Sequence, residues 1–129
     1  MIYLDTSVAL AHLLAEGQQP PTRLWDEVLI ASRLLEYEMW TRIHARKLTR
    51  THGDAVRDIL LRTALIELVA PVLERALEPF PAPVRTLDAL HLASIDFLRD
   101  HGQDVALASY DDGQRAAARA MGIRLYDLR

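Results

Sequence analysis

The chain has 129 residues and a mass of 14.6 kDa, with 50% hydrophobic residues, 26% charged residues and a formal net charge of −3 at pH 7. This length and composition predict a single globular domain over residues 1–129, and they exclude a disordered or collagen-like chain. The sequence contains no cysteine, which excludes a disulfide framework, a thiolate nucleophile and any cysteine-liganded metal site. Its acidic balance argues against nucleic-acid binding through bulk charge, although a local basic patch is compatible with it.

The sequence also carries no targeting signal that we can identify. The N-terminal residues lack the basic segment of a secretory signal and reach a carboxylate at Asp5. No later apolar run approaches the roughly 18 residues that a membrane span needs. We therefore expect a cytoplasmic protein.

Short apolar runs separated by amphipathic segments predict strands that alternate with helices. The first run, residues 2–4, ends at Asp5. Thr6 or Ser7 can then cap a helix over residues 8–15. The other predicted strands are residues 28–31, 66–69, 105–108 and 123–126.

The remaining helices are predicted from apolar residues at helical spacing and from residues that start or stop a helix. We expect Gly53 and Asp54 to begin one helix and Thr86 to cap another. Gly102 and Gly122 are expected to end the last two. Strands that alternate with helices imply right-handed crossovers and a parallel sheet covered on both faces, so the predicted class is a three-layer α/β/α fold. Besides a short helix after Pro21, these helices cover residues 34–48, 55–65, 72–77, 87–99 and 114–121.

Four acidic residues stand where a parallel sheet would bring them together. Asp5 and Asp111 directly follow predicted strands, and Glu38 and Asp88 lie near the starts of predicted helices. The ligand crevice of such a sheet lies beyond the carboxyl ends of its strands, so we expect these side chains at one edge. Each of them alone could simply complement the dipole of a helix N-terminus.

The apolar surroundings of these carboxylates favour a metal site over simple capping. Asp5 lies between the apolar runs 2–4 and 8–10, and Asp88 lies between apolar neighbours. Carboxylates gathered away from water repel one another unless a divalent cation neutralises them. Oxygen ligands, without cysteine or paired histidine, favour Mg²⁺ or Mn²⁺. Such a cation lowers the pKa of a bound water and stabilises charge on a phosphoryl oxygen, which is a route to phosphodiester hydrolysis.

At these residues the sequence resembles the PIN-domain family, and within it the VapC-like ribonuclease toxins of type II toxin-antitoxin modules. Residues 1–8, MIYLDTSV, are similar to the family's opening strand with its first acidic residue, and residues 32–38, SRLLEYE, to its S-x-L-x-x-x-E segment. Residues 85–93, RTLDALHLA, are the most specific match, and residues 108–111, ASYD, are similar to its S/T-x-D segment. Any one of these motifs is weak, but four in order at the family's spacings are specific.

The resemblance implies a central parallel sheet of four or five strands and Mg²⁺- or Mn²⁺-dependent cleavage of RNA, often of structured RNA such as transfer or ribosomal RNA. It also implies a homodimer that a cognate antitoxin inhibits. Glu36 competes with Glu38, and Asp112 competes with Asp111, but the motif spacings favour Glu38 and Asp111. The residues that the resemblance assigns to catalysis and metal binding are Asp5, Glu38, Asp88 and Asp111.

Two hydroxyl residues, Thr6 and Ser109, are similar to those that accompany the family's acidic site. They would orient a carboxylate or a metal-bound water, with helix capping and turn formation as the alternative. His91 lies one helical turn after Asp88 and, as a single histidine, is expected to be structural rather than catalytic.

The predicted helix over residues 34–48 has two different sides. Leu35, Met39 and Ile43 recur at helical spacing and are expected to face the core. On the side opposite this stripe, basic residues recur every four positions. They form either an ordinary solvated surface or a contact for the RNA phosphate backbone. These candidate RNA-binding residues are Arg42, Arg46, Lys47 and Arg50.

Two other functions stay open at this point. One is a catalytically silent PIN-like binding module, although all four acidic positions are occupied. The other is a haloacid-dehalogenase-like phosphatase, which usually needs a second aspartate where this chain has Ser7. If the chain is a metal-dependent ribonuclease, attack of water on phosphorus predicts product ends with a 5'-phosphate and a 3'-hydroxyl.

Overall fold

The computed structural model describes residues 1–15 and 17–129 and contains a five-stranded sheet. Every pair of neighbouring strands is parallel, and the strands follow the order β3-β2-β1-β4-β5. The predicted parallel sheet is therefore confirmed. The strands are β1 (Ile2–Leu4), β2 (Leu29–Ser32), β3 (Thr63–Ile66), β4 (Ala106–Ala108) and β5 (Arg124–Leu125).

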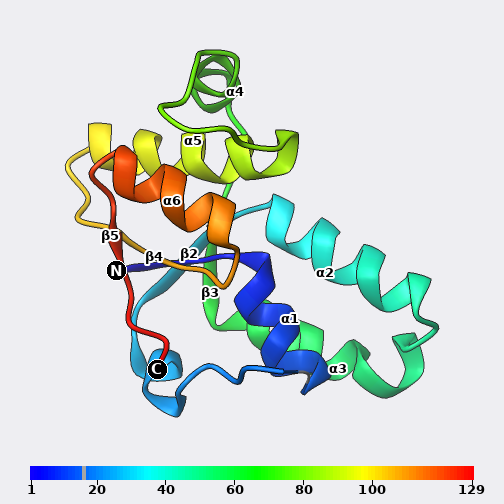
Figure 1. Cartoon of the computed structure of the whole chain (residues 1–129). Coiled ribbons are helices and arrows are strands. Elements are labelled where there is room, and N and C mark those ends of the chain that lie inside the picture. Colours follow the sequence, from blue (N-terminus) through cyan, green and yellow to red (C-terminus); the bar gives the residue numbers. More distant parts are fainter. Residues whose placement is uncertain (16) are drawn as a thin grey trace.

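Helices lie on both sides of the sheet (Figure 1). The helices α1, α2 and α3 contact one another on one side, whereas α4, α5 and α6 gather on the other. This arrangement confirms the predicted three-layer class. Within the described residues, no helix combines the length and the apolar character needed to cross a membrane. The helices are α1 (Thr6–Leu14), the short 3₁₀ helix η1 (Thr22–Asp26), α2 (Leu34–Ala45), α3 (Thr49–Leu61), α4 (Ala70–Ala76), α5 (Thr86–Asp100) and α6 (Asp112–Ala120).

The direction of the strand order reverses between β1 and β4. From β1 the chain runs outward through β2 to β3, while β4 pairs with the opposite side of β1 and is followed outward by β5. Right-handed crossovers place the helices of these two halves on opposite faces, so a crevice opens where β1 and β4 end side by side. Leu4 is aligned with Ala108, and the backbone N–H of Asp5 donates to the Ala108 carbonyl at 3.0 Å. The residues that follow both strands therefore meet at one edge.

The core lies between the sheet and the two helix layers. Leu35, Met39 and Ile43 of α2 are fully buried, as predicted. Helical spacing predicts an apolar stripe on α5 that consists of Leu87, Leu90, Ile95 and Leu98, but the prediction is wrong at Leu87, which is 45% exposed. The buried face of α5 begins only at Ala89.

The boundaries of α3 and β3 differ from the prediction by several residues, and α3 ends at Leu61 instead of residue 65. α3 begins at Thr49 and contains Gly53 in its interior, so Gly53 does not start the helix. β3 begins at Thr63, three residues before the strand predicted at 66–69, because its parallel pairing with β2 aligns Thr63 with Leu29.

The starts of α1 and α5 also differ from the prediction. Asp5, rather than Thr6 or Ser7, caps α1, because its carboxylate accepts a hydrogen bond from the Ser7 backbone N–H. Thr86 is the first residue of α5 instead of its cap, and Arg85 stands in the cap position without a capping side-chain bond.

The helix predicted over residues 34–48 is confirmed from Leu34, but its predicted end is wrong, since α2 ends at Ala45. Lys47 has a left-handed backbone with φ of 57°, and the Leu48 N–H donates to the Ile43 carbonyl at 2.9 Å, which is the long bond of a Schellman motif. Gly102 and Gly122 end α5 and α6 in the same way, as predicted.

This early end of α2 also overturns the continuous basic helix face. Arg42 belongs to α2, whereas Lys47 lies in the turn and Arg50 lies in the first turn of α3. The four-residue spacing of the arginines is therefore not a helical repeat.

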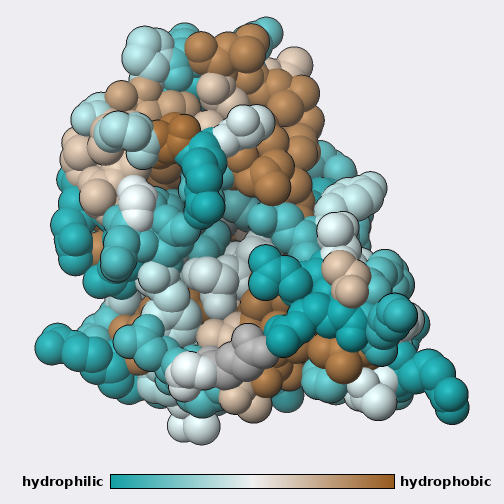
Figure 2. Space-filling model, turned by 45° about the vertical axis from the view of Figure 1, so that its right-hand side comes forward, coloured by the Kyte–Doolittle hydropathy of each residue, from teal (hydrophilic) through white to brown (hydrophobic). Residues whose placement is uncertain are grey.

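Large apolar side chains remain exposed around α4 and the start of α5. Figure 2 shows this hydrophobic surface in the upper part of the molecule, where these two helices lie in Figure 1. The chain does not cover this surface itself. The exposed residues there are Val69, Leu73, Leu77 and Leu87.

The central position of β4 gives a stability prediction. Leu107 is fully buried in β4, which pairs with both β1 and β5, so we expect Leu107→Ala to lower the free energy of unfolding by roughly 2–5 kcal/mol. The matched control is Leu61→Ala at the end of α3, where Leu61 is 85% exposed, and its change should stay within about 0.5 kcal/mol. Urea denaturation of both variants measures the difference, and equal losses would contradict the described core.

Candidate active site

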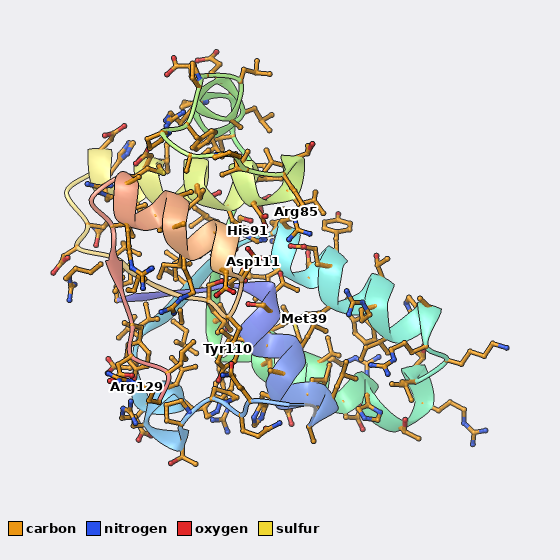
Figure 3. The ribbon with its side chains drawn as sticks, in the orientation of Figure 1. Met39, Arg85, His91, Tyr110, Asp111 and Arg129 are labelled. Atoms are coloured by element: carbon orange, nitrogen blue, oxygen red, sulfur yellow. The ribbon has the colours of Figure 1, made fainter. Side chains whose placement is uncertain are left out.

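A cleft of about 440 Å³ lies at the carboxyl ends of β1 and β4. Asp5, Glu38, Asp88 and Asp111 all line it, although they come from the end of β1, from α2, from α5 and from the turn before α6. Figure 3 shows Arg85 and Asp111 close together near the centre of the molecule, where α5 and α6 approach the start of α2. The structure thus brings the four predicted carboxylates to one cleft.

Asp5 is held by neutral donors from three parts of the chain. It is 4% exposed, and one oxygen of its carboxylate accepts from the Ser7 backbone N–H at 3.2 Å, from the Ser7 hydroxyl and from the Ser109 hydroxyl at 3.0 Å. With its amide nitrogen turned toward Asp5, Gln114 of α6 donates to the two carboxylate oxygens at 2.9 and 3.2 Å. These bonds fix the carboxylate at the strand end.

Glu38 is held by a hydroxyl and by a buried histidine. The Thr6 hydroxyl donates to Oε1 of Glu38 at 2.8 Å, and Nε2 of His91 lies 2.6 Å from the same oxygen. Because an ionised carboxylate only accepts, Nε2 carries the proton. Nδ1 of His91 lies 2.8 Å from the Tyr3 hydroxyl, which accepts from the Ser32 backbone N–H at 3.1 Å. A continuous buried chain therefore joins the end of β2 to Glu38.

The charges along this chain favour an ionised Glu38. Burial raises the pKa of Glu38, but the hydrogen bonds from His91 and Thr6 and the charge of Arg42 lower it by more, so its pKa lies below the ordinary value. Burial lowers the pKa of His91, whereas Tyr3 and Glu38 raise it by more, to about 10. His91 thus donates from Nε2 to the ionised carboxylate of Glu38.

Asp88 and Asp111 share one partner, the guanidinium of Arg85. Nη2 of Arg85 lies 2.7 Å from Asp111, and Nε lies 3.2 Å from Asp88. The other oxygen of Asp111 caps α6 by accepting from the Gln114 backbone N–H at 2.8 Å. Burial raises the pKa of Asp88, the charges of Asp111 and Asp5 raise it further, and Arg85 only partly offsets them. Burial and like charge therefore both oppose the ionisation of Asp88.

The donor chemistry of the cleft fits a hard divalent cation. Carboxylate oxygens are preferred ligands of Mg²⁺ and Mn²⁺, and four carboxylates line the cleft. Within residues 1–15 and 17–129, no group of three or more acidic or histidine side chains is already assembled as a metal site. Arg85 holds two of the carboxylates, so side chains have to rearrange before all four can contribute oxygens to one ion.

The competing acidic residues lie elsewhere in the described structure. Glu36 pairs with Arg33 at 3.2 Å and is not among the described residues that line the cleft. Asp112 lines two adjoining hollows but, among the described residues, is likewise not part of the cleft lining. The motif spacings that favour Glu38 and Asp111 therefore select the residues that face the cleft.

The candidate RNA-binding residues are spread along one edge of the molecule. Arg42 lines the cleft. Arg46, Lys47 and Arg50 follow at the junction of α2 and α3, and all four side chains are exposed. The structure thus places only Arg42 beside the carboxylates.

Four residues contact the acidic side chains but received no site role from the sequence: Ser7, which bonds Asp5, and also Arg85, His91 and Gln114. Arg85 stands three positions before Asp88, a spacing at which helical ion pairs form. His91 is a polar residue on the buried side of α5, and Gln114 is a 1% exposed amide in an alanine-rich helix. A polar residue on an otherwise apolar face is the signal that would have indicated the last two.

Comparison with known proteins identifies a family for this chain. Residues 2–120 match the model of the PIN domain family. Ribonuclease VapC47 of Mycobacterium tuberculosis (strain CDC 1551 / Oshkosh) is 29% identical in an alignment that covers 95% of this chain and 93% of VapC47.

Two solved structures share the fold. The toxin VapC20 of Mycobacterium tuberculosis, described as cleaving the sarcin-ricin loop, has a TM-score of 0.69 and 23% identity, covering 91% of this chain and 95% of VapC20. A toxin-antitoxin complex from Klebsiella pneumoniae contains a chain with a TM-score of 0.61 and 14% identity, covering 93% of this chain and 94% of that one. With the family model matching residues 2–120, the chain belongs to the PIN domain family.

Proposed function

We propose that this PIN domain is a divalent-metal-dependent endoribonuclease and the toxin of a type II toxin-antitoxin module. The observation that carries the proposal is the meeting of Asp5, Glu38, Asp88 and Asp111 on one cleft at the point where the strand order reverses. The similarity to ribonuclease VapC47 supports RNA as the substrate class. All four acidic positions are occupied, which argues against a catalytically silent binding module.

Asp5, Glu38, Asp88 and Asp111 would hold Mg²⁺ or Mn²⁺. A bound ion of this kind lowers the pKa of water and stabilises charge on a phosphoryl oxygen. The protein contributes orientation: Ser109 and Gln114 fix Asp5, and Thr6 and His91 fix Glu38. Hydrolysis would form a bond between the water oxygen and phosphorus and break the bond from phosphorus to the 3' oxygen. The water gives up a proton, and the departing 3' oxygen takes one up from solvent. The fragments then carry 5'-phosphate and 3'-hydroxyl ends.

The proposed partners follow from the same relatives. VapC20 is described as cleaving the sarcin-ricin loop, which supports a structured RNA as substrate. The Klebsiella pneumoniae structure is a toxin-antitoxin complex, which supports a cognate antitoxin protein as inhibitor. The exposed apolar surface around α4 supports a homodimer, because monomers seldom expose such surfaces without a partner. Cellular RNA as substrate would place the activity in the cytoplasm.

The decisive experiment is RNA cleavage with and without a chelator. We expect purified protein to lose cleavage in EDTA, to regain it with Mg²⁺ or Mn²⁺, and to release fragments that ligate to an adaptor requiring a 5'-phosphate. Asp5→Asn should abolish cleavage while keeping an acceptor for the α1 cap, and the exposed Asp104→Asn is its matched control. Cyclic-phosphate ends, or wild-type cleavage that persists in EDTA, would overturn the metal-dependent mechanism.

Glu38 and Glu36 provide an internal comparison within one helix. Glu38→Gln removes the charge that faces the cleft, so we expect cleavage to fall by about a hundredfold or more at saturating Mn²⁺. Glu36→Gln removes only the exposed pair with Arg33 and should leave the rate within about twofold. Single-turnover cleavage rates of the two variants test the assignment, and the reverse order would reject it.

The basic residues at the α2–α3 junction give a test of RNA binding. If Arg46 and Arg50 contact phosphates, the combined Arg46→Ala, Arg50→Ala variant should bind RNA more weakly and lose about two from the slope of log affinity against log salt. Arg124→Ala is the control, because Arg124 lies on β5 and pairs with Asp104. Anisotropy titrations at several salt concentrations measure the slope, and an unchanged slope would make these residues an ordinary solvated surface.

A further inference from the structure

Arg85 is a cation that pairs with two carboxylates of the cleft. Its guanidinium contacts Asp111 through Nη2 and Asp88 through Nε, and its side chain remains 79% exposed. Figure 3 shows Arg85 beside Asp111 at the start of α5. Arg85 therefore links two acidic residues of the cleft from the solvent side.

The other two carboxylates are held differently. Asp5 is bound by hydroxyl and amide donors, and Glu38 by a hydroxyl and by His91, which is 1% exposed. A buried histidine cannot leave without disturbing the core, whereas an exposed arginine loses little when it turns into water. Of these partners, Arg85 is the one that can be exchanged at low cost.

A divalent cation and Arg85 compete for the same oxygens. Asp88 and Asp111 cannot each give the same lone pairs to a metal and to the guanidinium at full strength. Once released, the planar guanidinium has parallel N–H donors that match two oxygens of a phosphate. Arg85 would then stand at the rim of the cleft, where the backbone of an incoming RNA passes.

We propose that Arg85 is an exchangeable counter-ion that occupies the carboxylates of the metal-free protein and becomes a phosphate-binding residue for RNA once a divalent cation replaces it, an inference that rests on the proposed metal-dependent function. Arg85 thus acts in substrate binding rather than in the chemical step. The two roles predict opposite effects of its removal. Metal binding should become tighter, and RNA binding should become weaker.

The test measures Mn²⁺ affinity by calorimetry and RNA affinity separately. Arg85→Ala and the neutral, hydrogen-bonding Arg85→Gln should both bind Mn²⁺ about threefold to tenfold more tightly than the wild type, because two exposed ion pairs no longer compete. In saturating Mn²⁺, both should bind a fluorescein-labelled RNA hairpin, chosen so that the wild type leaves it intact during the titration, about tenfold more weakly, since phosphate contacts do not depend on sequence. Arg124→Ala removes an exposed arginine that pairs with Asp104 and is not among the described residues that line the cleft, so it should change neither affinity.

The outcomes separate this inference from the proposed function. If the wild type binds no Mn²⁺ and cleaves RNA in EDTA, the proposed function fails. If the wild type requires Mn²⁺ but both Arg85 variants bind it equally or more weakly, Arg85 is not a competing counter-ion. Unchanged RNA affinity of both variants would overturn the phosphate contact. A merely structural Arg85 would weaken metal and RNA binding together.

Discussion

Repulsion among four carboxylates in one cleft is the constraint on which this site depends. The parallel pairing of β1 with β4 brings Asp5 and Asp111 to the same edge, and α2 and α5 add Glu38 and Asp88. Hydroxyls and an amide compensate Asp5, a hydroxyl and a buried histidine compensate Glu38, and Asp88 and Asp111 share an exposed arginine. Four like charges can therefore lie at one edge of the sheet, because hydrogen bonds from the surrounding elements fix and stabilise each carboxylate.

The features that the sequence predicts are those that depend on the order of neighbouring residues along the chain. Apolar runs followed by Asp5 and Asp111 identify strand ends, and parallel topology then places these residues together. Leu35, Met39 and Ile43 predict the buried side of α2, because side chains about one helical turn apart lie on the same side of the helix. Gly102 and Gly122 mark helix ends since glycine adopts positive φ without cost.

The features that the sequence does not predict are an unusual local conformation and contacts between distant residues. Lys47 adopts the left-handed conformation that usually belongs to glycine, so nothing in its type reveals the end of α2. The start of β3 follows from its alignment with β2 rather than from its own composition. The partnership of His91 with Tyr3 and Glu38 joins three elements, and no spacing along the chain encodes it.

Two of the four carboxylates also serve the fold. Asp5 and Asp111 cap α1 and α6, and a capping carboxylate stabilises a helix by about 1 kcal/mol. Asp88 has no such role, and its pKa is raised first by burial and further by the charges of Asp111 and Asp5, so its surroundings oppose its ionisation. A descendant of this protein released from selection on activity would still keep Asp5 and Asp111 for stability, whereas Asp88 could drift. Across related chains, retention of Asp88 is therefore a sharper sign of a working nuclease than retention of the aspartate after the first strand.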